Sequence, residues 1–313
     1  MAIAKSGAQG SSTRSIFRRV FADEIDLQSQ GNRLLYDLLK NDIVSGNVFP
    51  AIRNRYIDFY YKGGRLFEYR QGEFKTHIKY ASVLTLPKGK STQANADGDE
   101  NYLTAKDFQN LQYISDFAGG YKRIKENCSL YSGDEAAGVA SIYSQYSYAN
   151  KHKRAGGANN GRSNVVVLDI EIAFDKGKDR IDVLLYNKAE KTLRFCEAKH
   201  YSNKELWSRP SIKPPVVNQL ERYKAQITSK KEQILTAYRN YVNCVNTLFD
   251  LDLPLPQNVE DDVVLLIFGY DRDQFKGRFR DLLINDGSLG KVHYYSIGNI
   301  AGANIDNIWR KTR

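Results

Sequence analysis

Cysteine and histidine are scarce in this sequence. It contains three cysteines, Cys128, Cys196 and Cys244, and four histidines, all far apart along the chain. An odd number of scattered cysteines argues against a disulfide framework, and no Cys/His spacing typical of a zinc site is present. We therefore expect no disulfides and no zinc, and a reducing cytoplasm as the cellular location.

Long apolar segments are also absent. The longest uninterrupted one, Val263–Phe268, has six residues, whereas a membrane-spanning helix needs about 20. Residues 1–14 include no apolar stretch of the kind found in secretory signals, so we expect neither export nor a membrane partner. Hydrophobic residues still make up 42% of the chain, which is enough for a core and excludes a wholly disordered protein.

Acidic residues are outnumbered by basic ones. There are 46 Lys and Arg against 36 Asp and Glu, a formal net charge of +10, and the excess is spread over both halves of the chain. This charge is compatible with a nucleic-acid partner, although a solvated basic surface explains it equally well.

The pattern of residues 1–133 predicts an N-terminal α+β region. Apolar residues recur at three- and four-residue spacing over 15–40, which indicates two consecutive helices separated by a glycine. Residues 55–84 alternate as strands do, and they predict a three-stranded meander with Gly63–Gly64 as a two-residue hairpin turn. A further helix is predicted over 104–127.

The pattern of residues 134–313 predicts an α/β domain. A helix is expected over 134–150, and a basic, glycine-rich linker follows at 151–164, which by its composition is the best candidate boundary. Strands, then a helix, then alternating strand, helix and strand are predicted in turn over 164–174, 179–187, 192–200, 216–248, 262–270, 272–285 and 291–297. The order from the first of these helices is therefore α-β-β-β-α-β.

Three ionisable side chains on the second and third of these strands form a candidate site. Glu197 and Lys199 are two residues apart, so they project from the same face of their strand. A hairpin between the strands would bring Asp182 near Glu197. Two carboxylates beside a lysine make a site of hard oxygen donors suited to Mg²⁺. Burying such charged groups costs free energy, which favours a functional role for them.

This arrangement resembles the PD-(D/E)xK nuclease superfamily. Its motif reads here as Ile181–Asp182 on the second core strand and Glu197–Lys199 on the third, with Ile181 where the family often has proline. The resemblance covers residues 134–270 and implies a restriction-endonuclease-like core, a mixed central sheet flanked by helices. It also implies Mg²⁺, with Mn²⁺ as a substitute, bound by Asp182 and Glu197, and Lys199 as the catalytic cation.

The helix after the third strand adds to the resemblance. Gln219 and Tyr223 are four residues apart and share one helical face. They look like the Gln-x-x-x-Tyr motif of the RecB-like branch, where the pair lies beside the active site and helps to position metal, lysine or nucleic acid.

Other acids near the candidate site have two interpretations. Asp169 and Glu171 alternate on one strand and would share a face. Glu171 is a candidate third metal ligand, or one of two acids on a solvated strand face. Glu135 could play the same part, but we expect it to stabilise a helix N-terminus.

Candidate substrate-binding residues follow the third strand. Lys204, Trp207 and Arg209 lie just beyond the site, where a tryptophan between basic residues could stack on a base or simply anchor the loop. The tyrosine- and arginine-rich meander could bind nucleic acid or dock a partner protein.

We therefore expect a nuclease, that is, an Mg²⁺-dependent phosphodiesterase. We expect it to cut DNA rather than RNA and to act as an endonuclease. Because the superfamily supplies many effectors that act only in complexes, an activating protein partner in prokaryotic antiviral defence, restriction or repair is part of this expectation. The alternative is a catalytically silent module that binds nucleic acid or protein with the same fold.

Overall fold

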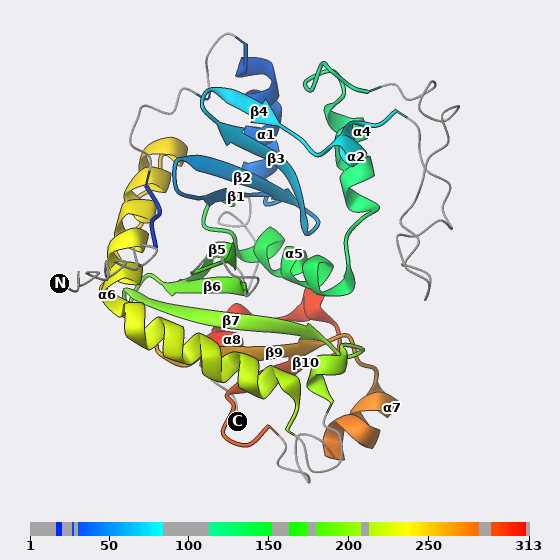
Figure 1. Cartoon of the computed structure of the whole chain (residues 1–313), viewed down its shortest axis with the longest axis vertical. Helices are drawn as coiled ribbons and strands as arrows, with labels where there is room; N and C mark the ends of the chain where they lie inside the picture. The colour runs from blue at the N-terminus through cyan, green and yellow to red at the C-terminus, as the bar shows by residue number, and fades with distance from the viewer. Residues whose placement is uncertain are drawn as a thin grey trace, which may run out of the picture.

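The chain folds around two β-sheets, as the computed structural model shows (Figure 1). The structure describes residues 17–20, 27, 31–83, 113–151, 163–174, 180–207, 213–281 and 289–310. Within these residues the chain is mixed α/β, as the sequence predicts. No helix in this part of the chain has the length and apolar character needed to cross a membrane.

The smaller sheet is antiparallel and has the order β1-β2-β3-β4. The elements of this region are α1 (Arg33–Val44), β1 (Val48–Ile52), β2 (Tyr56–Tyr61), β3 (Gly64–Arg70), β4 (Glu73–Lys75), α2 (Ile78–Ala81) and α4 (Tyr121–Ser129). The predicted meander is present as β2–β4, and β1 extends it.

Three local predictions for this region are wrong. The hairpin turn is Lys62–Gly63 rather than Gly63–Gly64, because Gly64 already pairs with Tyr61. Both turn residues have positive φ, 47° and 85°, as a tight hairpin with the twist of its strands requires. Residues 17–20 and 113–120 lie in predicted helices but are not helical, and residues 104–112 are outside the described residues.

The larger sheet has the order β10-β9-β7-β6-β5, with β8 paired to β7. Its strands and helices are α5 (Asp134–Tyr146), β5 (Val165–Ile172), β6 (Ile181–Asn187), β7 (Thr192–His200), η2 (Lys204–Leu206), α6 (Pro215–Phe249), β8 (Asn258–Val259), β9 (Val264–Phe268) and β10 (Tyr294–Ile297). Strands β5, β6 and β7 are antiparallel neighbours, whereas β9 runs parallel to β7 and β10. The sheet is therefore mixed.

The C-terminal helix predicted over 272–285 is present over 272–281, but it is kinked, and residues 282–285 lie outside the described residues. Helix α7 (Arg272–Gln274) continues directly into the π-helical turn η3 (Phe275–Phe279). Gly277, with φ −89° and ψ −130°, breaks the helix there. The short segments η5 (Ile300–Gly302) and α8 (Ile305–Trp309) are additions that periodicity did not reveal.

One hydrophobic core runs through both sheets. Helix α5 lies between them (Figure 1) and contacts β1, β5 and β7. Helix α6 extends along the larger sheet and reaches the smaller one, where the Tyr241 hydroxyl donates a hydrogen bond to the Pro50 carbonyl (3.4 Å). The two predicted regions, 1–133 and 134–313, are thus packed together, and the boundary between them stays a prediction. Residues 152–162 of the predicted linker lie outside the described residues.

Candidate functional site

Strands β6 and β7 place Asp182 and Glu197 opposite each other. Their antiparallel register pairs Val183 with Cys196, and continuing it by one residue sets Asp182 opposite Glu197. Because directly opposite residues of antiparallel strands project from the same face, the two carboxylates are neighbours. Asp182 Oδ2 also accepts a hydrogen bond from the Ala198 amide at 2.7 Å.

The two carboxylates are held in an environment that opposes their negative charge. Glu197 is only 2% exposed. Burial raises the pKa of Glu197 to about 7. The positive charge of Lys199 lowers this pKa, and the negative charge of Glu135 raises it. Burial and the charge of Glu197 raise the pKa of Asp182 well above its usual value, although the Asp182 residue as a whole keeps some solvent exposure. Glu197 Oε2 is buried and has no hydrogen-bond partner among the described residues. This atom is therefore an unsatisfied oxygen donor.

Lys199 lies between two carboxylates. Its Nζ is 2.9 Å from Glu197 Oε1 and 2.7 Å from Glu205 Oε2, and its side chain is buried whereas that of Glu205 is about half exposed (48%). Glu205 belongs to η2, directly after the third strand. Sequence reasoning missed Glu205, since no periodicity links a loop acid to a lysine six residues earlier.

Glu135 contacts the end of β7. Its Oε1 accepts hydrogen bonds from the His200 amide (3.2 Å) and from Asn203 Nδ2 (2.6 Å). Glu135 lies in the first turn of α5, but its hydrogen-bond donors are the last residue of β7 and a residue of the turn that follows β7. The expectation that Glu135 serves the helix N-terminus is therefore incomplete, because the same carboxylate ties α5 to the strand that carries Glu197 and Lys199.

Gln219 and Tyr223 of α6 support the start of β6. The Gln219 side-chain amide donates to the Tyr223 hydroxyl (2.8 Å), which donates to the Arg180 carbonyl (2.6 Å), two residues before Asp182. Gln219 Oε1 is buried without a hydrogen-bond partner in the described part of the chain. The pair can therefore fix the backbone from which Asp182 projects.

Asp169 and Glu171 do not share one environment, contrary to the simple alternation of β5. The register shifts between Val167 and Asp169, and Glu171 has a positive φ of 53°. Asp169 is fully buried, whereas Glu171 is partly exposed, with its Oε2 3.6 Å from Arg180 Nη1. Glu171 is close enough to raise the pKa of Asp182.

Asp169 is the centre of a charge-balanced network. Arg53 Nη1 donates to its Oδ1 (2.6 Å), and Arg19 Nε and the Tyr238 hydroxyl donate to its Oδ2 (3.2 and 2.8 Å). All three partners are themselves buried. We conclude that Asp169 joins the N-terminal segment, the β1–β2 turn and α6, and it is not available for chemistry.

The predicted substrate-binding residues lie in and after η2. Lys204 is exposed. The Trp207 indole donates to the Tyr201 carbonyl (3.1 Å) and packs edge-on against the Tyr201 ring, and the Arg278 guanidinium lies 4.1 Å from the indole centre. Trp207 thus anchors the loop, with one ring face already covered by a cation. Arg209 lies outside the described residues.

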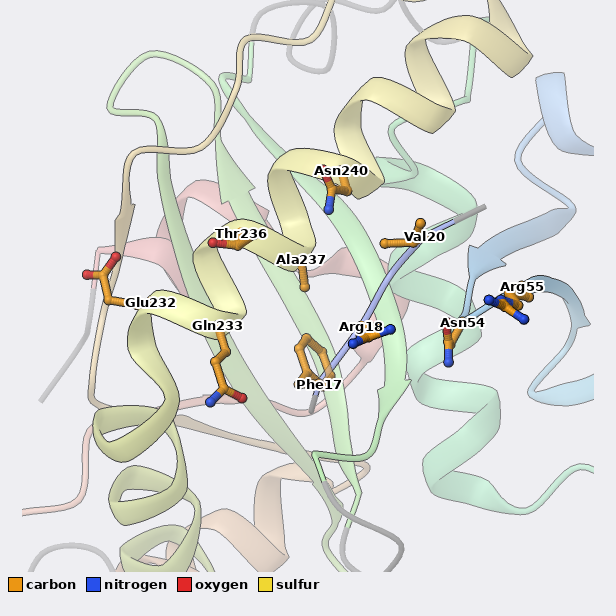
Figure 2. A pocket seen from close by; sticks show the side chains of 10 residues that line it. All are labelled: Phe17, Arg18, Val20, Asn54, Arg55, Glu232, Gln233, Thr236, Ala237 and Asn240. Carbon is orange, nitrogen blue, oxygen red and sulfur yellow. The ribbon is translucent and has the colours of Figure 1, made fainter. Parts of the chain in front are cut away.

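A cavity of about 500 Å³ lies away from this site, and Figure 2 shows the side chains that line it. It is formed by the N-terminal segment, the β1–β2 turn and α6, and is lined by Phe17, Arg18, Val20, Asn54, Arg55, Glu232, Gln233, Thr236, Ala237 and Asn240. Its α6 residues begin 13 positions after Gln219, which is about 20 Å along a helix. This cavity is therefore separate from the Asp182–Glu197 pair.

No group of three or more His, Cys, Asp or Glu side chains in the described residues is arranged to hold a metal ion. Glu171 therefore does not form a three-ligand set with Asp182 and Glu197 in this part of the chain. Comparisons of this chain with protein-family models, with curated proteins and with solved structures each returned no match.

Proposed function

We propose that this chain is a metal-dependent nuclease with a PD-(D/E)xK-type core of the RecB-like branch. The support is the order α5-β5-β6-β7-α6-β9, with Asp182 on the second strand, Glu197 and Lys199 on the third, and Gln219 and Tyr223 on the following helix. The proposed nuclease domain is 134–313, and 1–133 is its accessory region.

A single observation carries the proposal, namely the carboxylate pair with its unsatisfied oxygen. In the described part of the chain, Glu197 Oε2 is buried without a hydrogen-bond partner, and burial raises the pKa of both acids although Lys199 lies beside them. A buried pair of carboxylates with one lysine between them is costly to ionise. A divalent cation would remove that cost. Mg²⁺ is commonly held by one or two carboxylates together with water and substrate phosphate, so two protein ligands are sufficient.

Each side chain of the site would have its own role in the hydrolysis of a phosphodiester. Asp182 and Glu197 would hold Mg²⁺, which supplies charge neutralisation at the phosphate and lowers the pKa of a bound water. Lys199, fixed between Glu197 and Glu205, would donate hydrogen bonds to the attacking water or to a phosphate oxygen. Gln219 and Tyr223 would keep Asp182 in place through the Arg180 carbonyl.

DNA is the proposed substrate, and the net charge of +10 supports a polyanionic partner. We propose endonuclease activity and, as the biological setting, a prokaryotic defence, restriction or repair system in which a protein partner activates the enzyme.

The experiment is a cleavage assay with purified protein. Supercoiled plasmid, linear duplex, single-stranded DNA and RNA are incubated with Mg²⁺, Mn²⁺ or EDTA, using the wild type, Lys199→Ala and the exposed control Lys122→Ala. We expect DNA cleavage that requires the metal, is lost in Lys199→Ala and persists in Lys122→Ala. Cleavage undiminished in Lys199→Ala would refute the assignment, and a protein that binds DNA without cutting it would favour a silent binding module.

A further inference from the structure

A second cavity, of about 420 Å³, lies beside the carboxylate pair. Residues of β2 and β3 form one part of its wall, and Glu171, Ala173 and Arg180 form another. Arg180 is two residues before Asp182, which places the two Cα atoms at most about 7 Å apart. Glu171 also raises the pKa of Asp182. The cavity and the proposed catalytic centre are therefore adjacent.

Arginine and tyrosine dominate the wall of this cavity, which we name the arginine–tyrosine pocket. Its four arginines are Arg19, Arg53, Arg65 and Arg180, and its four tyrosines are Tyr56, Tyr60, Tyr80 and Tyr131. The acids in the wall are Asp58 and Glu171. Cations therefore outnumber anions in the wall itself, although the buried Asp169 behind it takes hydrogen bonds from two of the arginines.

Two of the arginines serve the fold and two face solvent. Arg53 is buried, and its guanidinium donates hydrogen bonds to Asp58, Asp169 and the Ile170 carbonyl. Arg65, in contrast, has a side chain 52% exposed, and among the described residues only its Nη1 is bonded, to Asp58 and Glu68. Arg180 is 59% exposed and has, within the same part of the chain, one long ion pair, to Glu171 at 3.6 Å. A guanidinium has five N–H donors, so both retain donors for a ligand.

The pocket is preformed by tight packing of the β2–β3 hairpin. A Cβ atom at Gly64 would lie 2.5 Å from Cys128 Sγ and 3.1 Å from the Tyr80 hydroxyl, and one at Gly63 would lie 2.5 Å from the Ala136 Cβ. The hairpin is therefore seated directly on α4 and α5. Ala136 is next to Glu135, so the same contact fixes the pocket relative to β7.

We propose that the arginine–tyrosine pocket binds a nucleotide of the DNA strand that flanks the bond to be cut, an inference that rests on the proposed nuclease function. Arg65 and Arg180 contact its phosphate, because guanidinium groups match phosphate geometry. The half-buried Tyr56 and Tyr131 each have a cation over one ring face, Arg70 at 4.1 Å and Lys79 at 4.6 Å from the ring centre, so a base would stack on the opposite face. The volume lies within the usual range of about 300–1,000 Å³ for ligand pockets.

The first test measures binding without cleavage. A fluorescently labelled single-stranded DNA oligonucleotide is titrated in EDTA against the wild type, Arg65→Gln, Arg180→Gln and the double variant. The control is Arg123→Gln, which removes an arginine of similar exposure (42%) that also pairs with a glutamate three residues later. Circular dichroism and melting temperature confirm that each variant is folded.

We expect each pocket variant to raise the Kd about tenfold, as the loss of a charge-assisted hydrogen bond implies. The slope of log Kobs against log salt should fall by about 0.7 for each phosphate contact removed from a single strand. Arg123→Gln should change neither. An unchanged Kd and slope in the double variant would refute DNA binding by the arginine–tyrosine pocket. Metal-dependent cleavage by the wild type would then still support the nuclease proposal.

The second test locates the base directly. The same oligonucleotide carrying 5-iododeoxyuridine is photo-crosslinked to the wild type, and the modified peptides are identified by mass spectrometry. We expect crosslinks at Tyr56 or Tyr131 that excess unlabelled oligonucleotide removes. Crosslinks confined to peptides outside the pocket would refute the inference. So would equal competition by a free deoxynucleoside monophosphate, which would identify a nucleotide effector site instead.

Discussion

Two acidic centres lie within the same sheet and differ in their charge balance. On β5, Asp169 is fully buried and receives hydrogen bonds from Arg53, Arg19 and Tyr238. On β6 and β7, Asp182 and Glu197 share one lysine, and that lysine is also paired with Glu205. One centre therefore has an excess of donors, and the other has an excess of acceptors.

The comparison shows why burial of an acid does not by itself indicate a function. Asp169 would be selected first by burial alone, because it is the more inaccessible acid. Its charge is compensated by protein groups, so it has no capacity left for a ligand. Among the described residues, the Asp182–Glu197 pair has a buried oxygen without a hydrogen-bond partner, and its pKa values stay raised because Lys199 and the Ala198 amide only partly offset the effect of burial.

The largest effect is expected for Asp169→Asn. This change leaves Arg19 buried without its anion and Arg53 with Asp58 alone, and breaking a buried pair in this way costs about 3–5 kcal/mol of unfolding free energy. Urea denaturation followed by circular dichroism measures the change. A loss below about 1 kcal/mol would show that Asp169 is not the structural centre described above.

Asp182→Asn should have the opposite profile. Because folding raises the pKa of Asp182, its ionised form is less favourable in the folded state, and the neutral amide should leave stability unchanged or higher. Cleavage should fall by at least about 100-fold, equivalent to about 2.7 kcal/mol of barrier. Urea titrations and cleavage rates on the same preparation test both parts. Strong destabilisation would make Asp182 a second structural acid.

Magnesium should stabilise the folded protein through the Asp182–Glu197 pair and not through Asp169. At about ten times its Kd, Mg²⁺ should stabilise the wild type by about 1.4 kcal/mol, seen as a rise in melting temperature. Asp182→Asn and Glu197→Gln should lose that rise. Asp169→Asn, if folded, should melt lower but keep the Mg²⁺-dependent increment. Equal increments in all variants would place the metal elsewhere.

The smallest effect is expected for Glu205→Gln. The Glu205 side chain is about half exposed (48%), so its ion pair with Lys199 should contribute about 1 kcal/mol or less. We expect cleavage to change by less than about tenfold, since Lys199 keeps Glu197 as a partner. Comparison of cleavage rates for Glu205→Gln and Lys199→Ala measures this difference. A loss as large as that of Lys199→Ala would make Glu205 part of the reacting centre.

Strong local patterns predicted much of the fold and the central part of the candidate site. The apolar alternation of β5, β6 and β7 and the long periodic stretch of α6 gave these elements nearly at their observed bounds. Elements without such a pattern were missed, for example β8 and α8, which are short and held by tertiary contacts. The hairpin turn was misplaced by one residue because two adjacent glycines satisfy the same local rule.

The sequence by itself determined which residues could face each other. A period of two puts Glu197 and Lys199 on one face, and a short connection brings Asp182 to the same strand end, where its carboxylate accepts a hydrogen bond from the Ala198 amide. Only the tertiary structure decided which acids are neutralised. Arg53 and Arg19 reach Asp169 from over 100 positions away in the chain, and Glu135 reaches the end of β7 from α5. Charge compensation depends on distance in space, and no local periodicity encodes it.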